Sequence, residues 1–141
     1  MRNQSYEIIE RLPTAEEHLT LWESVGWGTV DREMAEQSLA RSIYGVIVLF
    51  GGDVVGMGRI VGDGAMYFYI QDVAVLPEHQ KRGIGDMIVR RLLDFITSNK
   101  RNDGNAFVGL FASRGNDTFY ERFGFQDHSL DMTGMFKVLE P

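Results

Sequence analysis

Residues 72–85 read DVAVLPEHQKRGIG, an apolar run followed by a short polar loop that contains two glycines. The apolar run predicts the end of a long strand over residues 66–76. Apolar residues then recur at helical spacing, which predicts an amphipathic helix over about 83–100. A short apolar strand is expected at 106–111. A strand, a helix and a second strand in this order predict a right-handed parallel crossover.

The part of the chain before this unit predicts antiparallel strands. Gly51-Gly52 lies between two β-rich runs at 45–50 and 54–61, which is a strong hairpin signal. A second glycine turn leads into the long strand already described. Three consecutive antiparallel strands are therefore expected.

The N-terminal region predicts a strand over 6–12 and two helices. Thr14 and Glu17 have the spacing of a capping box, which predicts a helix from Thr14 to about Val25. Asp31 is expected to cap a second helix that ends near Arg41.

The C-terminal region predicts a short helix over 115–123, and one or two closing strands from Phe125 onward. Together these elements predict an α/β fold with a mixed antiparallel–parallel central sheet of six or seven strands and about four helices. We expect a single domain over residues 1–141.

Composition excludes several classes of protein. The 141 residues include 20 acidic and 14 basic side chains, a net charge of −6, which argues against general nucleic-acid binding. Without cysteine there can be no disulfide, thiolate metal site or cysteine nucleophile. The three histidines show no metal-ligand spacing. No apolar run approaches the roughly 20 residues of a membrane span, and the first residues do not resemble a signal peptide. We therefore expect a cytoplasmic protein.

The loop before the long helix has features of a phosphate site. Backbone N–H groups at a helix N-terminus lack internal partners and carry the positive end of the helix dipole. Gly83 and Gly85 have no Cβ to keep an anion away, and Lys81 and Arg82 add positive charge. Taken alone, such a loop is as often an ordinary turn, and neither the Walker nor the dinucleotide glycine pattern is present.

Two segments in register identify a family resemblance. Residues 72–85 resemble the acetyl-CoA signature of the GNAT N-acetyltransferases, Q/R-x-x-G-x-G/A after a V-A-V strand. Residues 119–125, FYERFGF, resemble the C-terminal L-Y-E-K-x-G-F segment of that family. The expected order of elements is also the family's order. The resemblance implies a GNAT fold and an acetyl-CoA-dependent N-acetyltransferase.

The resemblance implies how acetyl-CoA is held. Pantetheine would lie between the fourth and fifth strands on the backbone of Val73 and Val75, and the amides from Lys81 to Gly85 would hold the pyrophosphate. The residues expected to contact the cofactor are Val73, Ala74, Val75, Gln80, Lys81, Arg82, Gly83, Ile84, Gly85, Ser113, Asn116, Phe119 and Tyr120. The family often has Asn where Ser113 stands and a small Ala where Asn116 stands, so the pattern of contacts from this segment is expected to differ.

Tyr120 matches the tyrosine that protonates the leaving thiolate in many family members. A phenol with a pKa of about 10 is a proton donor at neutral pH, although an aromatic side chain here also suits a core position. The general base stays open. By period-two alternation Tyr69, Gln71 and Val73 share a face, and neither Tyr69 nor Gln71 is a good base. Asp72 is the nearest carboxylate, but alternation places it on the opposite face unless a β-bulge turns it. The alternative to Asp72 as general base is ordered water.

The acceptor is expected to be the primary amine of a small molecule with an apolar or aromatic part, in a pocket that includes Trp27, Tyr69 and Gln71. The acidic balance mildly favours a cationic acceptor. Direct attack in a ternary complex is expected because no cysteine can carry an acyl group. The alternatives are a GNAT-fold protein that binds CoA without catalysis and, more remotely, an unrelated nucleotide-binding domain. An edge strand would permit a homodimer.

Overall fold

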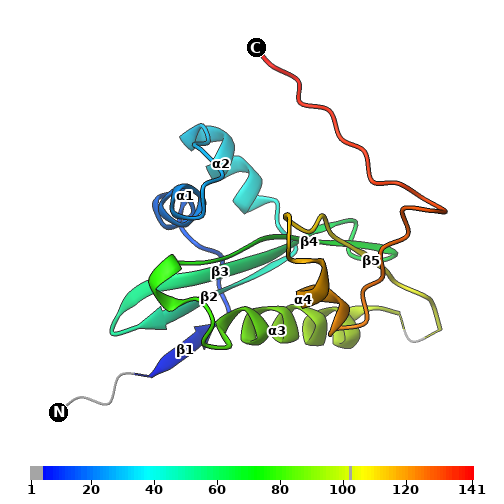
Figure 1. The fold of residues 1–141 in the computed structure, drawn as a ribbon, viewed down its shortest axis with the longest axis horizontal. Helices are drawn as coiled ribbons and strands as arrows, with labels where there is room; N and C mark the ends of the chain where they lie inside the picture. The colour runs from blue at the N-terminus through cyan, green and yellow to red at the C-terminus, as the bar shows by residue number, and fades with distance from the viewer. Residues whose placement is uncertain (1–4, 102) are drawn as a thin grey trace. The chain divides into compact units, whose positions relative to one another are not determined.

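A computed structural model describes residues 5–101 and 103–141 of the protein. They fall into two units, one that ends at Gly109 and one from Leu110 to Pro141. The first unit contains a five-stranded sheet in the order β1-β2-β3-β4-β5 (Figure 1). Its strands are β1 (Tyr6–Ile9), β2 (Tyr44–Phe50), β3 (Asp53–Gly62), β4 (Tyr67–Val75) and β5 (Phe107–Gly109). The first four strands are antiparallel and β5 is parallel to β4, which confirms the predicted mixed sheet.

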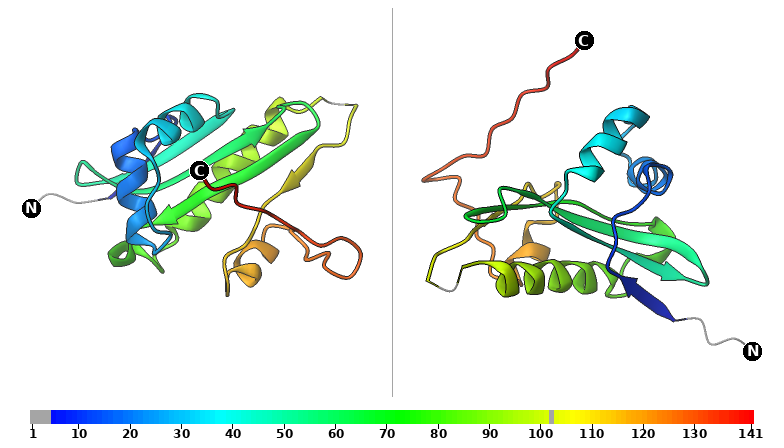
Figure 2. Two further views of the ribbon diagram at one scale, coloured as in Figure 1. Left: turned by 90° about the horizontal axis from the view of Figure 1, so that it is seen from above. Right: turned by 180° about the vertical axis from the view of Figure 1, so that it is seen from behind.

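Helices cover both faces of this sheet. Helices α1 (Ala15–Ser24) and α2 (Arg32–Ala40) lie on one face and α3 (Ile84–Asn99) lies on the other (Figures 1 and 2). A short 3-10 helix, η1 (Pro77–His79), connects β4 to α3. The second unit contains α4 (Asp117–Glu121). None of the helices in the described residues has the length and apolar content that a membrane crossing needs.

Helix α1 begins where its capping residues predict. The backbone N–H of Glu17 donates to Thr14 Oγ1 at 3.1 Å, and the backbone N–H of Thr14 donates to Glu17 Oε1 at 2.8 Å. These two bonds satisfy N–H groups that have no partner within the helix. Asp31 caps α2 in a similar way, through Met34 N–H at 3.0 Å.

Glycines in β3 allow α3 to lie close to the sheet. A Cβ on Gly58 would stand 2.5 Å from Ile88 Cγ2 and 3.2 Å from Leu92 Cδ1. Both of these α3 side chains are fully buried. Each buried aliphatic side chain contributes roughly 1.5–3 kcal/mol, so this contact fixes α3, and with it the loop that precedes α3.

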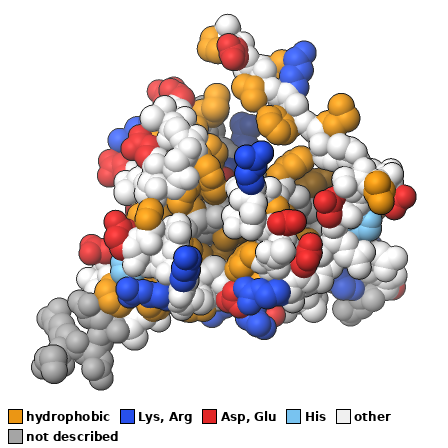
Figure 3. All heavy atoms as spheres, in the orientation of Figure 1, with side chains coloured by type: hydrophobic (Ala, Val, Ile, Leu, Met, Phe, Trp, Pro, Cys, Tyr) orange, Lys and Arg blue, Asp and Glu red, His pale blue; other side chains and the backbone are white. Residues whose placement is uncertain are grey.

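The predicted closing strands are not formed. Residues 125–141 adopt no strand in the structure, which leaves five strands in place of the six or seven expected. A strand needs a neighbour to satisfy its backbone N–H and C=O groups, and the second unit offers none. Many large apolar side chains of this segment are exposed (Figure 3). They are Leu130, Met132, Met135, Phe136, Val138 and Leu139.

Candidate active site

Strand β4 has an edge that is only partly paired. Its parallel pairing with β5 covers Tyr67, Phe68 and Tyr69 and then stops. On the other side, β4 stays paired with β3 as far as Val75. None of the described strands pairs with residues 70–75 on the β5 side, so this stretch can accept an extended polar chain as an added strand.

A β-bulge interrupts β4 at Asp72. This residue has a left-handed backbone, with φ of 57°, and the register of the β3–β4 pair shifts between Met57 and Arg59. A bulge lets two successive side chains lie on the same face of a sheet. Gln71 lies beside α2, and Asp72 contacts His18 of α1 on that same face.

The bulge also moves the following residues. The side chain of Val73 lies on the face of the sheet that α3 covers. Its Cγ2 is 3.6 Å from the position that a Cβ on Gly58 would occupy, and side chains of α3 also approach that position. Ala74 packs instead against Leu21 of α1. The prediction that Val73 shares the face of Gln71 is therefore wrong, because simple alternation takes no account of the extra residue.

Asp72 is the centre of a buried polar cluster with His18 and Arg59. Its Oδ2 accepts hydrogen bonds from Arg59 Nε at 2.7 Å and from His18 Nε2 at 3.0 Å. Burial raises the pKa of Asp72, but the hydrogen bond from His18 and the charge of Arg59 outweigh it and lower the pKa below 3.8. A carboxylate with a lowered pKa and two cationic or N–H partners is a poor general base at neutral pH.

His18 belongs to this cluster, although nothing in the sequence pattern singles it out as a site residue. Its side chain is 4% exposed, and its Nδ1 is buried without a hydrogen-bond partner among the described residues. The ring also packs on Trp22, with 5.3 Å between the ring centroids. The spacing of three residues between His18 and Leu21 is the feature of the sequence that could have indicated burial, because it places both residues on the inner face of α1.

The loop between β4 and α3 has the backbone that an anion site needs. Lys81 and Gly83 are both left-handed, with φ of 63° and 83°. Alternation between left- and right-handed residues turns successive N–H groups toward one point. Gly83 is the N-cap of the 16-residue helix α3 and has no side chain of its own to bond the first amides of the helix.

Side chains around this loop tie it to the sheet. Gln80 Nε2 donates to the backbone oxygen of Val75 at 3.0 Å, which links the loop to the end of β4. Tyr6 Oη lies 2.8 Å from His79 Nδ1 and accepts a hydrogen bond from Arg82 Nη1 at 3.2 Å. Gln80 and Arg82 therefore form hydrogen bonds within the protein, and both residues are still exposed to solvent.

The second unit holds the predicted residues Ser113, Asn116, Phe119 and Tyr120 on one short segment. The backbone N–H of Asn116 donates to Ser113 O at 2.9 Å, and that of Tyr120 donates to Asn116 O at 3.2 Å. Tyr120 is half-buried and makes an edge contact with Phe119, with 4.9 Å between centroids. Burial raises the pKa of Tyr120, so its phenol keeps its proton at neutral pH.

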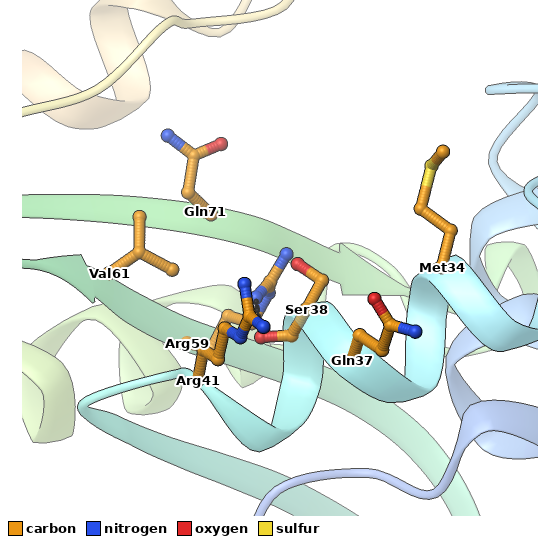
Figure 4. A pocket seen from close by; sticks show the side chains of 7 residues that line it. All are labelled: Met34, Gln37, Ser38, Arg41, Arg59, Val61 and Gln71. Atoms are coloured by element: carbon orange, nitrogen blue, oxygen red, sulfur yellow. Dashed lines mark hydrogen bonds between the residues drawn. The ribbon is translucent and has the colours of Figure 1, made fainter.

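A pocket of about 520 Å³ lies between the end of α2 and strands β3 and β4 (Figure 4). It contains Gln71, one of the three residues expected to form the acceptor pocket. Its lining residues are Met34, Gln37, Ser38, Arg41, Arg59, Val61 and Gln71. Trp27 and Tyr69 do not line it: the ring of Trp27 packs against Trp22 at 5.1 Å, and that of Tyr69 lies 6.3 Å from Phe107.

Solved structures with similar folds are acetyltransferases by name. A protein of unknown function from meticillin-resistant Staphylococcus aureus, named a probable acetyltransferase, has a TM-score of 0.89 and 29% identity. That match covers 96% of this chain and 100% of the other. A GNAT-family acetyltransferase from Streptococcus pneumoniae has a TM-score of 0.81 and 32% identity, over 97% of this chain and 100% of the other.

Sequence comparison agrees with this fold. A curated relative from Arabidopsis thaliana, "GCN5-related N-acetyltransferase 2, chloroplastic", is 35% identical over 83 residues, which are 59% of this chain and 31% of the relative. The chain thus spans about a third of the length of the first curated relatives it matches. Because that relative is named chloroplastic, the expected cytoplasmic location stays a prediction. Residues 41–127 match the family model described as "Acetyltransferase (GNAT) domain". The chain belongs to the GNAT acetyltransferase family.

Proposed function

We propose that the protein transfers the acetyl group of acetyl-CoA to the primary amine of a small molecule, by direct attack in a ternary complex. The observation that carries this proposal is the unpaired edge of β4 over residues 70–75, which leads directly into the left-handed loop before α3. A strand edge suits the amides of pantetheine, and the loop suits a pyrophosphate.

The residues of the first unit have separate roles in this proposal. Backbone groups of Val73 and Val75 hold the pantetheine arm as an added strand. The amides from Lys81 to Gly85 hold the pyrophosphate, with positive charge from Lys81 and Arg82. Gln80 acts indirectly, because its side-chain amide fixes the loop to the Val75 carbonyl.

Tyr120 supplies the proton for the leaving sulfur in this proposal. Its raised pKa keeps the phenol protonated until the thiolate develops, which is the property that a general acid needs. The acetyl group passes directly to the amine, since the chain has no cysteine to carry it. The amine loses its proton to water, because Asp72 Oδ2 is already held by Arg59 and His18.

The same ion pair favours a second candidate function, a protein that binds CoA without transferring an acetyl group. With Asp72 occupied, β4 has no free carboxylate to serve as a base. Release of free thiol from acetyl-CoA in the presence of amines distinguishes the two functions. Binding without thiol release, for every amine tested, would support the second.

Calorimetric titration of acetyl-CoA and CoA into paired variants at Gly83 tests the cofactor site. Asn and Asp both tolerate a left-handed backbone, so Gly83→Asn and Gly83→Asp differ mainly in charge. We expect Gly83→Asp to weaken binding at least tenfold more than Gly83→Asn, because a carboxylate there repels the pyrophosphate. Equal binding by the two variants, or no binding by the wild type, would contradict the proposed site.

A further inference from the structure

The pocket beside α2 contains two guanidinium groups, those of Arg41 and Arg59, and no carboxylate is among its lining residues. This local charge is opposite to the net charge of −6 on the whole chain. The remaining polar lining includes the side-chain amides of Gln37 and Gln71, which bring further N–H donors. Cations and donors without an acid make a site suited to an oxyanion.

Arg59 is held in one orientation before any ligand arrives. Its Nε donates to Asp72 Oδ2, and its Nη1 donates to Ser42 Oγ at 2.9 Å and to Ser38 O at 3.2 Å. No hydrogen bond within the described part of the chain uses Nη2. A side chain that is already fixed loses little conformational entropy when it binds a ligand.

Arg41 supplies the charge that is not neutralised. It follows the last residue of α2, is exposed, and is in none of the ion pairs among the described residues. Asp72 neutralises Arg59, so Arg41 leaves the pocket with a net positive charge. The two arginines come from different elements and line the same pocket (Figure 4).

We propose that the acceptor amine carries an anionic group, a carboxylate or a phosphate monoester, which Arg41 and Arg59 bind in this pocket. This inference rests on the proposed function and adds the substrate class. Gln71 links the two regions, because it lines the pocket and belongs to the part of β4 whose edge is unpaired. The amine end of the acceptor then extends from the arginines toward that edge.

Matched amines and a charge-removing variant test this substrate class. The pairs are β-alanine with β-alaninamide and phosphoethanolamine with ethanolamine, assayed by thiol release at saturating acetyl-CoA. The test variant is Arg41→Gln, because Arg59 is buried with Asp72 and its loss would damage the fold. The control is Arg32→Gln, which removes an exposed arginine of α2 outside the pocket.

We expect the wild type to have a higher kcat/KM for the anionic member of at least one pair. A preference for β-alanine indicates a carboxylate site, and a preference for phosphoethanolamine indicates a phosphate site. Arg41→Gln should lower kcat/KM for that anionic amine by about tenfold or more, as expected for the loss of a charge-assisted contact. Its kcat/KM for the neutral partner should fall much less, and Arg32→Gln should change neither. Equal use of both members, or an equal loss for both in Arg41→Gln, would overturn the inference.

A binding measurement separates this inference from the proposed function. In CoA-saturated wild-type protein, we expect β-alanine or phosphoethanolamine to shift the NMR signals of the side chains of Arg41, Gln37 and Gln71. In Arg41→Gln, the shifts of the Gln37 and Gln71 signals should vanish. Acetyl-CoA binding with no such shift overturns the anion site alone. If acetyl-CoA does not bind and no thiol is released, the proposed function fails, and the same titration of the free protein still decides whether the pocket takes an anion.

Discussion

Arg59 and Asp72 form a largely buried ion pair, with 2.7 Å between Arg59 Nε and Asp72 Oδ2. The pair depends on the left-handed backbone of Asp72, which turns its side chain to the face of the sheet that Arg59 occupies. The same bulge lies within the unpaired edge of β4. The ion pair therefore stabilises the irregular strand along which we propose that acetyl-CoA binds.

Replacing Asp72 with Asn should be strongly destabilising. The neutral amide leaves the largely buried guanidinium of Arg59 without a counter-charge, which costs at most about 3–5 kcal/mol of unfolding free energy. Urea denaturation of the wild type and Asp72→Asn measures this difference. Asp94→Asn, an exposed change on α3, is the control and should alter stability by less than about 0.5 kcal/mol. Similar midpoints for Asp72→Asn and Asp94→Asn would show that the ion pair contributes little.

The contribution of this pair should depend on pH. Burial raises the pKa of Asp72, but His18 and Arg59 lower it further, so the folded-state pKa lies below the ordinary 3.8. The stabilisation is then fully present above the unfolded pKa and is lost as pH falls through the folded value. We expect the stability difference between the wild type and Asp72→Asn to shrink as the pH falls below about 4. A difference that grows in acid would contradict the lowered pKa.

Tyr120→Phe tests the proposed proton donor. The variant keeps the ring that packs on Phe119 and Phe125 and removes only the hydroxyl. We expect kcat to fall about 100-fold or more with little change in KM, because general acid catalysis contributes at least this much. The control is Tyr67→Phe, which removes an exposed hydroxyl from β4. Equal kcat in all three proteins would exclude the acid role.

Tyr6 should affect acetyl-CoA binding although it lies on β1. Its hydroxyl contacts His79 Nδ1 and Arg82 Nη1, so it positions the loop that precedes α3. Tyr6→Phe should weaken acetyl-CoA binding about fivefold, the effect of losing a hydrogen bond worth about 1 kcal/mol. Calorimetric titration measures this change, again with Tyr67→Phe as the control. Unchanged affinity in Tyr6→Phe would mean that Arg82 needs no such support.

Local chemistry explains which features could be predicted from the sequence. The Thr14–Glu17 capping box and the glycine loop before α3 depend on residues close together in the chain, and the structure has both. Five strands of the mixed sheet also follow from local patterns. The prediction of closing strands after Phe125 is wrong. A strand forms only where another strand pairs with it, and a local sequence pattern does not show whether such a partner is present.

The buried polar cluster could not be predicted, because it depends on contacts across the fold. His18 and Asp72 are 54 residues apart in the chain, and no spacing rule joins them. The sequence allows a β-bulge at Asp72 but does not require one, and only the register of the β3–β4 pair shows that the bulge is there. The pocket arginines likewise come from separate parts of the chain, since Arg41 follows α2 and Arg59 lies on β3. This explains why the net charge of the chain suggested a cationic acceptor, while the local charge favours an anionic group.

Gly58→Ala should disturb both stability and acetyl-CoA binding. The added methyl group would stand 2.5 Å from Ile88 Cγ2, so the Ile88 side chain must shift, and we expect α3 to shift with it. Overpacking of this kind costs about 1–3 kcal/mol. Because α3 begins in the pyrophosphate loop, its movement should also weaken acetyl-CoA binding in calorimetry. Gly104→Ala is the control, since its Cβ would have no neighbour closer than 3.8 Å. A stable Gly58→Ala protein with wild-type affinity would show that the α3 contact does not position the loop.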